Sequence, residues 1–130
     1  MKFLVIIKPE IVAHRVLAQV AISELQQGGV KIEKMKEMTI GWKLAKSLYE
    51  QHKGKFFYDR LITHIISGPV IAMRVSGAPR ASIGSSRLWP RVEPENQPIR
   101  QKLALSDVRN VAHASDEDVA DKELQLFGLL

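Results

Sequence analysis

Five consecutive apolar residues near the start of the chain, Phe3 to Ile7, stop abruptly at Lys8 and Pro9. A short apolar run of this kind, rich in β-branched residues, predicts a buried strand. Proline ends the strand because it has no amide hydrogen to donate to a sheet. The run is too short for the apolar stretch of a signal peptide, so we expect a chain without a membrane segment and a cytoplasmic location.

The rest of the chain alternates helical and extended patterns. Helical spacing is shown by Val12, Val16, Leu17, Val20, Ala21 and Leu25, followed by a Gly28-Gly29 stop. Val30 and Ile32 then alternate with charged residues through about Thr39, which predicts a strand with one solvated face. The remaining elements are expected over 42–52 (helix), 56–66 (helix), 70–75 (strand), 99–105 (short helix or extended segment), 108–112 (strand) and 116–127 (helix), with a long loop over 77–98.

This order of elements, β-α-β-α-α-β-loop-β-α, predicts an α+β fold. The arrangement is consistent with a ferredoxin-like split βαβ topology, with a four-stranded antiparallel sheet and added helices. At 130 residues the chain is expected to form one domain over 1–130. The absence of cysteine excludes disulfides, thiol nucleophiles and Cys-ligated zinc.

The charge balance favours an anionic partner. The chain has 19 basic and 14 acidic residues, a formal net charge of +5 and a pI of about 9.6. Most of its arginines fall late in the sequence, at Arg74, Arg80, Arg87, Arg91, Arg100 and Arg109. The planar guanidinium suits phosphate oxygens, but charge by itself does not choose among nucleic acid, nucleotide phosphates and a membrane surface.

Two short segments carry most of the chemical information. Lys8 lies where the first strand gives way to a helix, a common ligand position in folds that alternate strands and helices. Near the end of the chain, Ser115 is a candidate N-cap, with Asp118 three residues later as a short variant of a capping box. His113 is therefore expected just ahead of a helix N-terminus, where unpaired amides favour an anion such as a phosphate.

With these two segments in view, the sequence resembles the nucleoside diphosphate kinases. The resemblance covers nearly the whole chain and depends on several matches in order rather than on any one of them. The matching pieces are Ile7-Lys8-Pro9-Glu10, Tyr49, Phe56-Phe57, Ser67-Gly68-Pro69-Val70, Ile99-Arg100 and Asn110-Val111-Ala112-His113-Ala114-Ser115-Asp116.

The resemblance implies an enzyme that passes the terminal phosphate of a nucleoside triphosphate to a diphosphate through a phosphohistidine. It also implies Mg²⁺ carried by the nucleotide's phosphates, with no metal site made of protein ligands, and a homo-oligomer; no specific nucleic acid is expected as a partner. The residues it assigns are His113 as nucleophile; Lys8 and Arg100 as phosphate clamps; Asn110 on the sugar 3′-hydroxyl; Phe56 under the base, with Leu61 also on the nucleotide; Tyr49 near the histidine; and Glu123, partnered by Ser115, orienting the imidazole. His14, His52 and His64 are read as ordinary structural or surface residues.

The segment from Gly77 to Leu105 departs from the family pattern. Its loop is several residues shorter than is usual, and Gln101-Lys102-Leu103 stands where the family has Gly-Asp-Phe. The loop contains no threonine, and the second phosphate arginine is assigned to Arg87, with Arg80 and Arg91 as rivals. Because this loop commonly builds subunit contacts in the family, the form of the assembly stays open.

Two alternatives accompany the phosphotransferase reading. The altered loop motivates a non-catalytic relative that acts as a scaffold. The high pI motivates a nucleic-acid-binding ferredoxin-like module, but the strand Val70 to Val75 offers no aromatic platform of the kind on which such modules stack bases.

Overall fold

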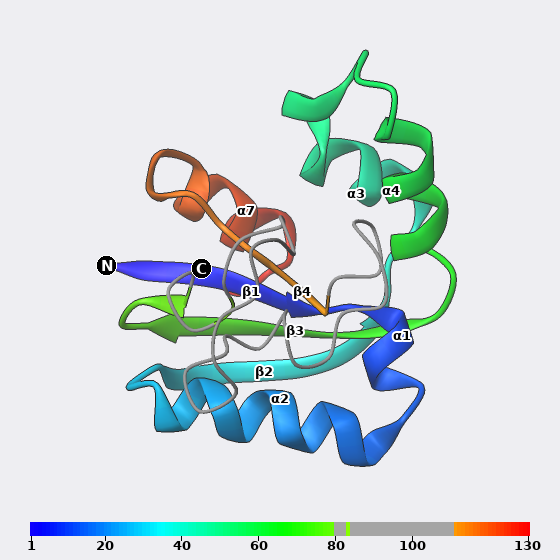
Figure 1. Ribbon diagram of the computed structural model, residues 1–130. Coiled ribbons are helices and arrows are strands. Elements are labelled where there is room, and N and C mark those ends of the chain that lie inside the picture. The colour runs from blue at the N-terminus through cyan, green and yellow to red at the C-terminus, as the bar shows by residue number, and fades with distance from the viewer. Residues whose placement is uncertain (80–82, 84–110) are drawn as a thin grey trace, which may run out of the picture.

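The computed structural model describes residues 1–79, 83 and 111–130, and these ranges form a sheet flanked by helices (Figure 1). In chain order the elements are β1 (Lys2–Ile7), α1 (Pro9–Val12), α2 (Arg15–Gln27), β2 (Lys31–Thr39), α3 (Trp42–Leu48), the 3₁₀ turn η1 (Glu50–His52), α4 (Tyr58–Ile65), β3 (Pro69–Ser76), β4 (Ala112–Ala114), the 3₁₀ turn η3 (Glu117–Val119) and α7 (Ala120–Leu126).

The four strands form one antiparallel sheet in the order β2-β3-β1-β4. The first strand therefore lies in the middle of the sheet, paired with β3 on one side and β4 on the other. This order confirms the predicted ferredoxin-like α+β fold with a four-stranded antiparallel sheet. It also brings β4, near the end of the chain, beside the C-terminal end of β1.

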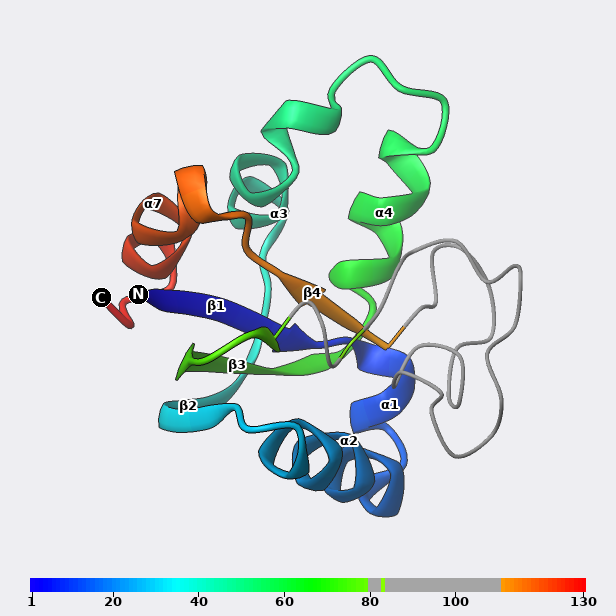
Figure 2. The ribbon, with the colours of Figure 1, turned by 60° about the vertical axis from the view of Figure 1, so that its left-hand side comes forward.

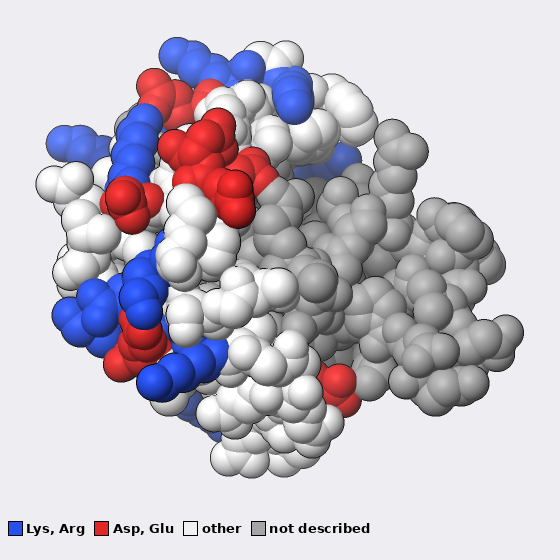
Figure 3. Space-filling view, turned by 90° about the vertical axis from the view of Figure 1, so that its left-hand side faces the viewer, with Lys and Arg blue, Asp and Glu red and all other residues white. Residues whose placement is uncertain are grey.

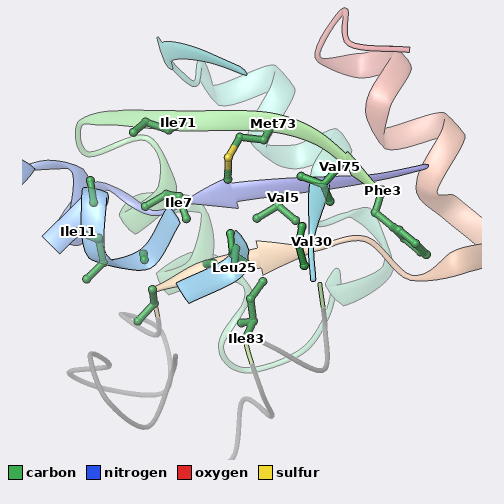
Figure 4. Close-up of a cluster of buried hydrophobic side chains, with 14 of the residues drawn as sticks. Phe3, Val5, Ile7, Ile11, Leu25, Val30, Ile71, Met73, Val75 and Ile83 are labelled. Carbon is green, nitrogen blue, oxygen red and sulfur yellow. The ribbon is translucent and has the colours of Figure 1, made fainter. Parts of the chain in front are cut away.

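Both faces of β1 are covered, which explains its uninterrupted apolar sequence. Phe3, Val5 and Ile7 pack toward α1 and α2, in a core that also contains Leu25 and Met73 (Figure 4). Leu4 and Ile6 alternate with them and pack on the opposite face, in a second core built with residues of α3, α4 and α7. Figure 2 shows the sheet between these two layers of helices. Packing on both faces holds β1 in place, and β1 in turn fixes the position of β4, which pairs with it.

The first helical segment differs from the prediction. The expected helix is interrupted after α1, because the backbone at His14 is extended, and α2 restarts at Arg15. The restart changes which side chains face the core: Ala18, Ala21 and Leu25 are buried, whereas Val16 and Val20 are 71% and 38% exposed. Val16 and Val20 therefore share the helical spacing of the segment but do not belong to the buried face of α2.

Two later helices are also divided. The helix expected over 42–52 ends at Leu48 and continues only as the 3₁₀ turn η1, and the helix expected over 116–127 consists of η3 followed by α7. The last strand reaches Ala114 rather than stopping at Ala112, so His113 lies inside β4. Ser115 is not an N-cap: Asp116 precedes η3, and Ser115 makes tertiary hydrogen bonds instead. His113 therefore does not project from a helix start.

Several predictions concern residues outside the described ranges. These are most of the loop over 77–98, the segment 99–105, the first residues of the predicted strand 108–112, and the site residues Arg80, Arg87, Arg91, Arg100 and Asn110. Within the described part of the chain, no helix is both long enough and apolar enough to cross a membrane.

On the face of the molecule shown in Figure 3, basic and acidic side chains of the described residues are interspersed. Across the described part of the chain as a whole, several basic and acidic side chains form pairs, namely Lys2–Glu33, Arg74–Glu33, Arg15–Glu37 and Lys122–Glu50. The exposed pairs among these, Arg15–Glu37 and Lys122–Glu50, contribute little to stability. The described side chains on the face in Figure 3 therefore do not form the continuous basic surface that is typical of nucleic-acid binding.

Gly77, directly after β3, lies very close to the backbone of another segment. Its φ is +104°, and a Cβ there would lie 2.9 Å from the carbonyl oxygen of Gly29. Gly54 also has a positive φ, +90°, but open space around it. We predict that Gly54→Ala lowers the free energy of unfolding by about 1 kcal/mol through backbone strain. Gly77→Ala should lower the free energy of unfolding by roughly 1 to 3 kcal/mol more than Gly54→Ala does, because the new Cβ would overlap the carbonyl oxygen of Gly29.

Urea denaturation of the two variants measures the difference, and Gly54→Ala is the control for positive φ. Equal losses of stability in the two variants would show that the contact between Gly77 and Gly29 does not constrain the fold.

Candidate active site

The position of His113 follows from the pairing of β4 with β1. His113 lies opposite Ile6 in the antiparallel register, and side chains of directly opposed residues lie on the same face of a sheet. Ile6 belongs to the core shared with α3, α4 and α7. The imidazole therefore projects toward the helical layer that contains Tyr49 and Glu123, with 14% of its side chain exposed.

The imidazole is held by a buried carboxylate. The Nε2 atom of His113 lies 2.9 Å from Oε1 of Glu123, whose side chain is only 5% exposed. An ionised carboxylate can only accept hydrogen bonds, so Nε2 must carry the hydrogen and donate it. The second ring nitrogen, Nδ1, is then unprotonated in the neutral imidazole, and its lone pair is available for nucleophilic attack.

Ser115 fixes the same carboxylate from the other side. Its hydroxyl donates to Oε1 of Glu123 at 2.7 Å and accepts a hydrogen bond from the main-chain amide of Leu4 at 3.2 Å. The Ser115 amide donates to the Leu4 carbonyl at 2.9 Å. Glu123 is thereby tied through Ser115 to the central strand β1, and the orientation of the imidazole depends on that strand.

These contacts keep Glu123 ionised. Burial alone would raise the pKa of Glu123, but the hydrogen bonds from His113 and Ser115 and the nearby Lys122 charge lower the pKa below its ordinary value. The lowered pKa means that the carboxylate is charged at neutral pH. A charged acceptor gives a stronger hydrogen bond to Nε2 and stabilises any positive charge that develops on the ring.

A row of aromatic rings leads away from the histidine. The Tyr49 ring packs edge-on against His113, with the ring centroids 5.8 Å apart, and His52 follows 6.1 Å from Tyr49. Phe57 lies 5.5 Å beyond His52, and Phe56 a further 5.3 Å along. Phe57 is half-buried, whereas Phe56 is 86% exposed. The row runs from the buried Tyr49 ring beside His113 to the exposed ring of Phe56.

His52 was not identified from the sequence as a site residue. Burial, together with the positive charges of Lys55 and a protonated His113, lowers its pKa below the ordinary value, although Glu123 acts in the opposite sense. His52 is therefore neutral at pH 7. The sequence spacing between Tyr49 and His52 could have indicated it, because residues three positions apart lie on the same side of a helical turn.

Lys8 lies where β1 ends and α1 begins. Its main-chain amide donates to the Val111 carbonyl at 2.7 Å, and the residue as a whole is only 3% exposed. This hydrogen bond places Lys8 beside the residue that comes two positions before His113. The structure thus brings together Tyr49, His113, Ser115 and Glu123, and it places the main chain of Lys8 next to Val111.

The other predicted nucleotide residues are placed differently. Leu61 is half-buried on α4 and packs against the core of that layer. Arg87, Arg100 and Asn110 lie outside the described residues. In the described ranges, no group of three or more His, Asp or Glu side chains is arranged to hold a metal ion.

Solved structures share this fold. A nucleoside diphosphate kinase from Halobacterium salinarum in complex with CDP superposes with a TM-score of 0.84 at 30% identity, covering 98% of this chain and 86% of that chain. A nucleoside diphosphate kinase from Aquifex aeolicus has a TM-score of 0.83 at 23% identity, covering 97% and 93%, a likeness of fold only.

Relatives found by sequence comparison are nucleoside diphosphate kinases as well. A nucleoside diphosphate kinase from Sulfurisphaera tokodaii is 38% identical over 127 residues, covering 95% of this chain and 85% of its own length. One from Ignicoccus hospitalis is 39% identical with the same coverage. Fold, site and relatives together define the chain as a phosphotransferase enzyme. The family model described as nucleoside diphosphate kinase matches residues 2–128, and the chain belongs to that family.

The hydroxyl of Ser115 generates a testable prediction. Ser115→Ala should lower the free energy of unfolding by about 1 to 3 kcal/mol at pH 7, because buried partners lose a hydrogen bond. It should also raise the pKa of Glu123 back toward its ordinary value. A carboxyl with a lowered folded pKa stabilises the fold above its unfolded pKa, and that stabilisation is lost as pH falls through the folded pKa. The difference between wild type and variant should therefore narrow below about pH 4.5.

Urea denaturation at several pH values from 7 to 3 makes this comparison. Ser67→Ala is a matched control, because the exposed Ser67 hydroxyl donates to the carbonyl of His64. It should change stability by no more than about 0.5 kcal/mol. A Ser115→Ala cost that equals the control, or that stays constant down to pH 3, would contradict the assigned role.

Proposed function

We propose that this chain transfers the terminal phosphate of a nucleoside triphosphate to a nucleoside diphosphate, with His113 as the covalent carrier. The observation that supports this most directly is the hydrogen bond between Nε2 of His113 and the buried carboxylate of Glu123. That contact gives the imidazole one protonated and one nucleophilic nitrogen at neutral pH. A fixed tautomer of this kind is what a histidine nucleophile requires.

The reaction proceeds in two similar steps. Nδ1 of His113 attacks the terminal phosphorus, the bond from that phosphorus to the bridging oxygen breaks, and a nucleoside diphosphate leaves. The ring then carries a phosphate on Nδ1, a hydrogen on Nε2 and a positive charge, which the Glu123 carboxylate stabilises at 2.9 Å. A terminal oxygen of the second diphosphate attacks the same phosphorus, the N–P bond breaks, and the neutral imidazole returns.

Charge on the transferring group is offset by cations. Lys8 is proposed to contact the phosphates from the end of β1, with Arg100 and Arg87 as further clamps. Mg²⁺ is proposed to enter with the nucleotide, bound by its phosphate oxygens, and to neutralise part of their charge. The donor set fits this arrangement, because Glu123 is already engaged by two hydrogen-bond donors. Asp116 is a candidate for a contact with the Mg²⁺ ion through a water molecule.

The nucleotide is proposed to extend from His113 along the aromatic row. Phe56 is the residue proposed to stack on the base, Asn110 to bind the sugar 3′-hydroxyl, and Leu61 to contact the nucleotide. Stacking on an aromatic face tolerates every base, since each has a π-surface. None of these contacts reads a base edge, so broad use of purine and pyrimidine nucleotides follows. The Halobacterium relative in complex with CDP supports a pyrimidine in such a site.

The remaining proposals concern the setting of the reaction. We propose a cytoplasmic homo-oligomer. Exposed apolar side chains, among them Val16 on α2 and Met35 on the edge strand β2, support contacts between copies, since 71% and 56% of their surfaces are exposed.

The nucleophile is tested by covalent labelling. Incubation with γ-labelled ATP and Mg²⁺ should give one acid-labile, base-stable label per active chain, and His113→Ala should abolish it. His14→Ala is the matched control, because His14 is an exposed residue at the start of α2. It should be labelled like the wild type.

Persistent labelling of His113→Ala would contradict the assignment of the nucleophile. A wild-type chain that binds nucleotide without becoming labelled would instead support the scaffold alternative.

The base platform is tested by comparing two neighbouring phenylalanines. Phe56→Ala should raise KM for ATP, GTP, CTP and dTTP by roughly tenfold, since a stacking contact is worth about 1 to 3 kcal/mol. The loss should be larger for purines, which have more surface to stack. Steady-state kinetics on the four nucleotides measure both effects.

Phe57→Ala is the comparison variant, because Phe57 lies next in the row and is half-buried against His52. If Phe57→Ala shows the base-dependent loss and Phe56→Ala does not, the platform is Phe57 and the proposed assignment is wrong.

A further inference from the structure

Val111, two residues before His113, has an unusual backbone. Its φ is +83°, and among the described residues it is the one non-glycine residue with a positive φ. Valine disfavours this region because its branched side chain meets the backbone. The residue is also completely buried. Such a conformation persists only where the surrounding structure holds it in place.

Both hydrogen-bonding groups of Val111 are held by one short segment of the chain. Its carbonyl accepts a hydrogen bond from the Lys8 amide at 2.7 Å. Its amide donates to Oε1 of the Glu10 side chain at 3.0 Å. The second hydrogen bond is the more informative. The Val111 amide lies just before β4, and the Glu10 side chain accepts its hydrogen.

Glu10 is itself fixed by a third element. Its other oxygen, Oε2, accepts a hydrogen bond from Nε2 of His64, near the end of α4, at 2.6 Å. The two side chains are only 7% and 11% exposed. Burial alone would raise the pKa of Glu10, but the hydrogen bonds from His64 and from the Val111 amide lower it, which keeps the carboxylate an acceptor. Glu10 is hydrogen-bonded to His64 and to the Val111 amide, whereas His113 is hydrogen-bonded to Glu123.

Glu10 is linked to His113 through a short piece of main chain, because it is hydrogen-bonded to Val111, two residues before His113. Strand β4 contains only Ala112, His113 and Ala114, and its pairing with β1 begins at Ala112 opposite Ile7. The turn at Val111 therefore sets where β4 starts and how its side chains are directed. A nucleophile displaced by about 1 Å can lose about 10²-fold in rate even when the cause lies far from the reacting atoms.

We propose that Glu10, held in place by His64, is a positioning residue that sets the attack geometry of His113 by keeping Val111 in its left-handed conformation. This inference rests on the proposed function, since it concerns the rate at which His113 takes the phosphate. Glu10 acts through the main chain and not on the nucleotide, so its effect belongs to the transfer step rather than to binding.

The test compares Glu10→Ala with Glu10→Gln in single-turnover phosphorylation of His113 by ATP and Mg²⁺. Glu10→Ala should slow phosphorylation by about tenfold to a hundredfold, with the nucleotide Kd changed by less than about threefold. Glu10→Gln should recover most of the rate, because its amide oxygen can still accept the Val111 hydrogen. Glu37→Ala is the control: it removes an exposed carboxylate that pairs with Arg15, and it should phosphorylate like the wild type.

A second readout does not depend on activity. The Val111 amide proton of ¹⁵N-labelled protein should resonate downfield in the wild type and in Glu10→Gln, and should move upfield in Glu10→Ala. His64→Ala, which releases Glu10 on one side only, should give an intermediate shift and rate. If Glu10→Ala does not fold, Glu10→Gln and His64→Ala carry the same comparison.

Wild-type rates in Glu10→Ala, or a Glu10→Gln rate as low as that of Glu10→Ala, would overturn the proposal. A Val111 amide resonance that stays at its wild-type position in Glu10→Ala, Glu10→Gln and His64→Ala would also overturn it. If the wild type takes no label at all, the proposed function fails, whereas the amide resonance still tests whether Glu10 holds Val111.

Discussion

One carboxylate oxygen, Oε1 of Glu123, accepts hydrogen bonds from both His113 and Ser115, and the chemistry of the site depends on it. The oxygen is buried, so its charge is compensated by these donors rather than by water. His113 gains a fixed tautomer from this contact, and Ser115 transmits the position of the main chain at Leu4 to the carboxylate. A rigid strand and an ionised acceptor are both needed, because the loss of either would free the imidazole to rotate.

The rigidity comes from the two cores on either side of β1. Alternate side chains of this strand enter different hydrophobic clusters, so neither face can shift without disturbing packed side chains. The strands β3 and β4 pair with β1 on its two edges, and His113 lies on β4 directly opposite Ile6. Just before β4, Val111 is held by Lys8, which directly follows β1, and by Glu10 in α1. The central strand thus organises both ends of the short strand that carries the nucleophile.

Three of the four strands could be predicted from the sequence, whereas the bounds of β4 and the side-chain contacts of the site could not. Strands β1 and β3 could be predicted because a short apolar run between breakers has few other uses in a small fold. The phase of α2 could not, since Val16 looks apolar in any helical register and the break at His14 has no strong sequence signal. Ser115 has the local pattern of an N-cap, but its hydroxyl is used by Leu4, 111 residues away in the chain. The pairing of His113 with Glu123 was expected only through the family resemblance, because spacing does not reveal tertiary contacts.

The tautomer of His113 tests this account most directly, and it can be measured without nucleotide. Long-range ¹H–¹⁵N correlation spectra of the imidazole distinguish a hydrogen on Nε2 from one on Nδ1. The hydrogen bond to Glu123 predicts a single Nε2-protonated tautomer near neutral pH in the wild type, and a mixture of tautomers in Glu123→Ala. A wild-type imidazole that carries its hydrogen on Nδ1, or a tautomer that is unchanged by Glu123→Ala, would contradict the account.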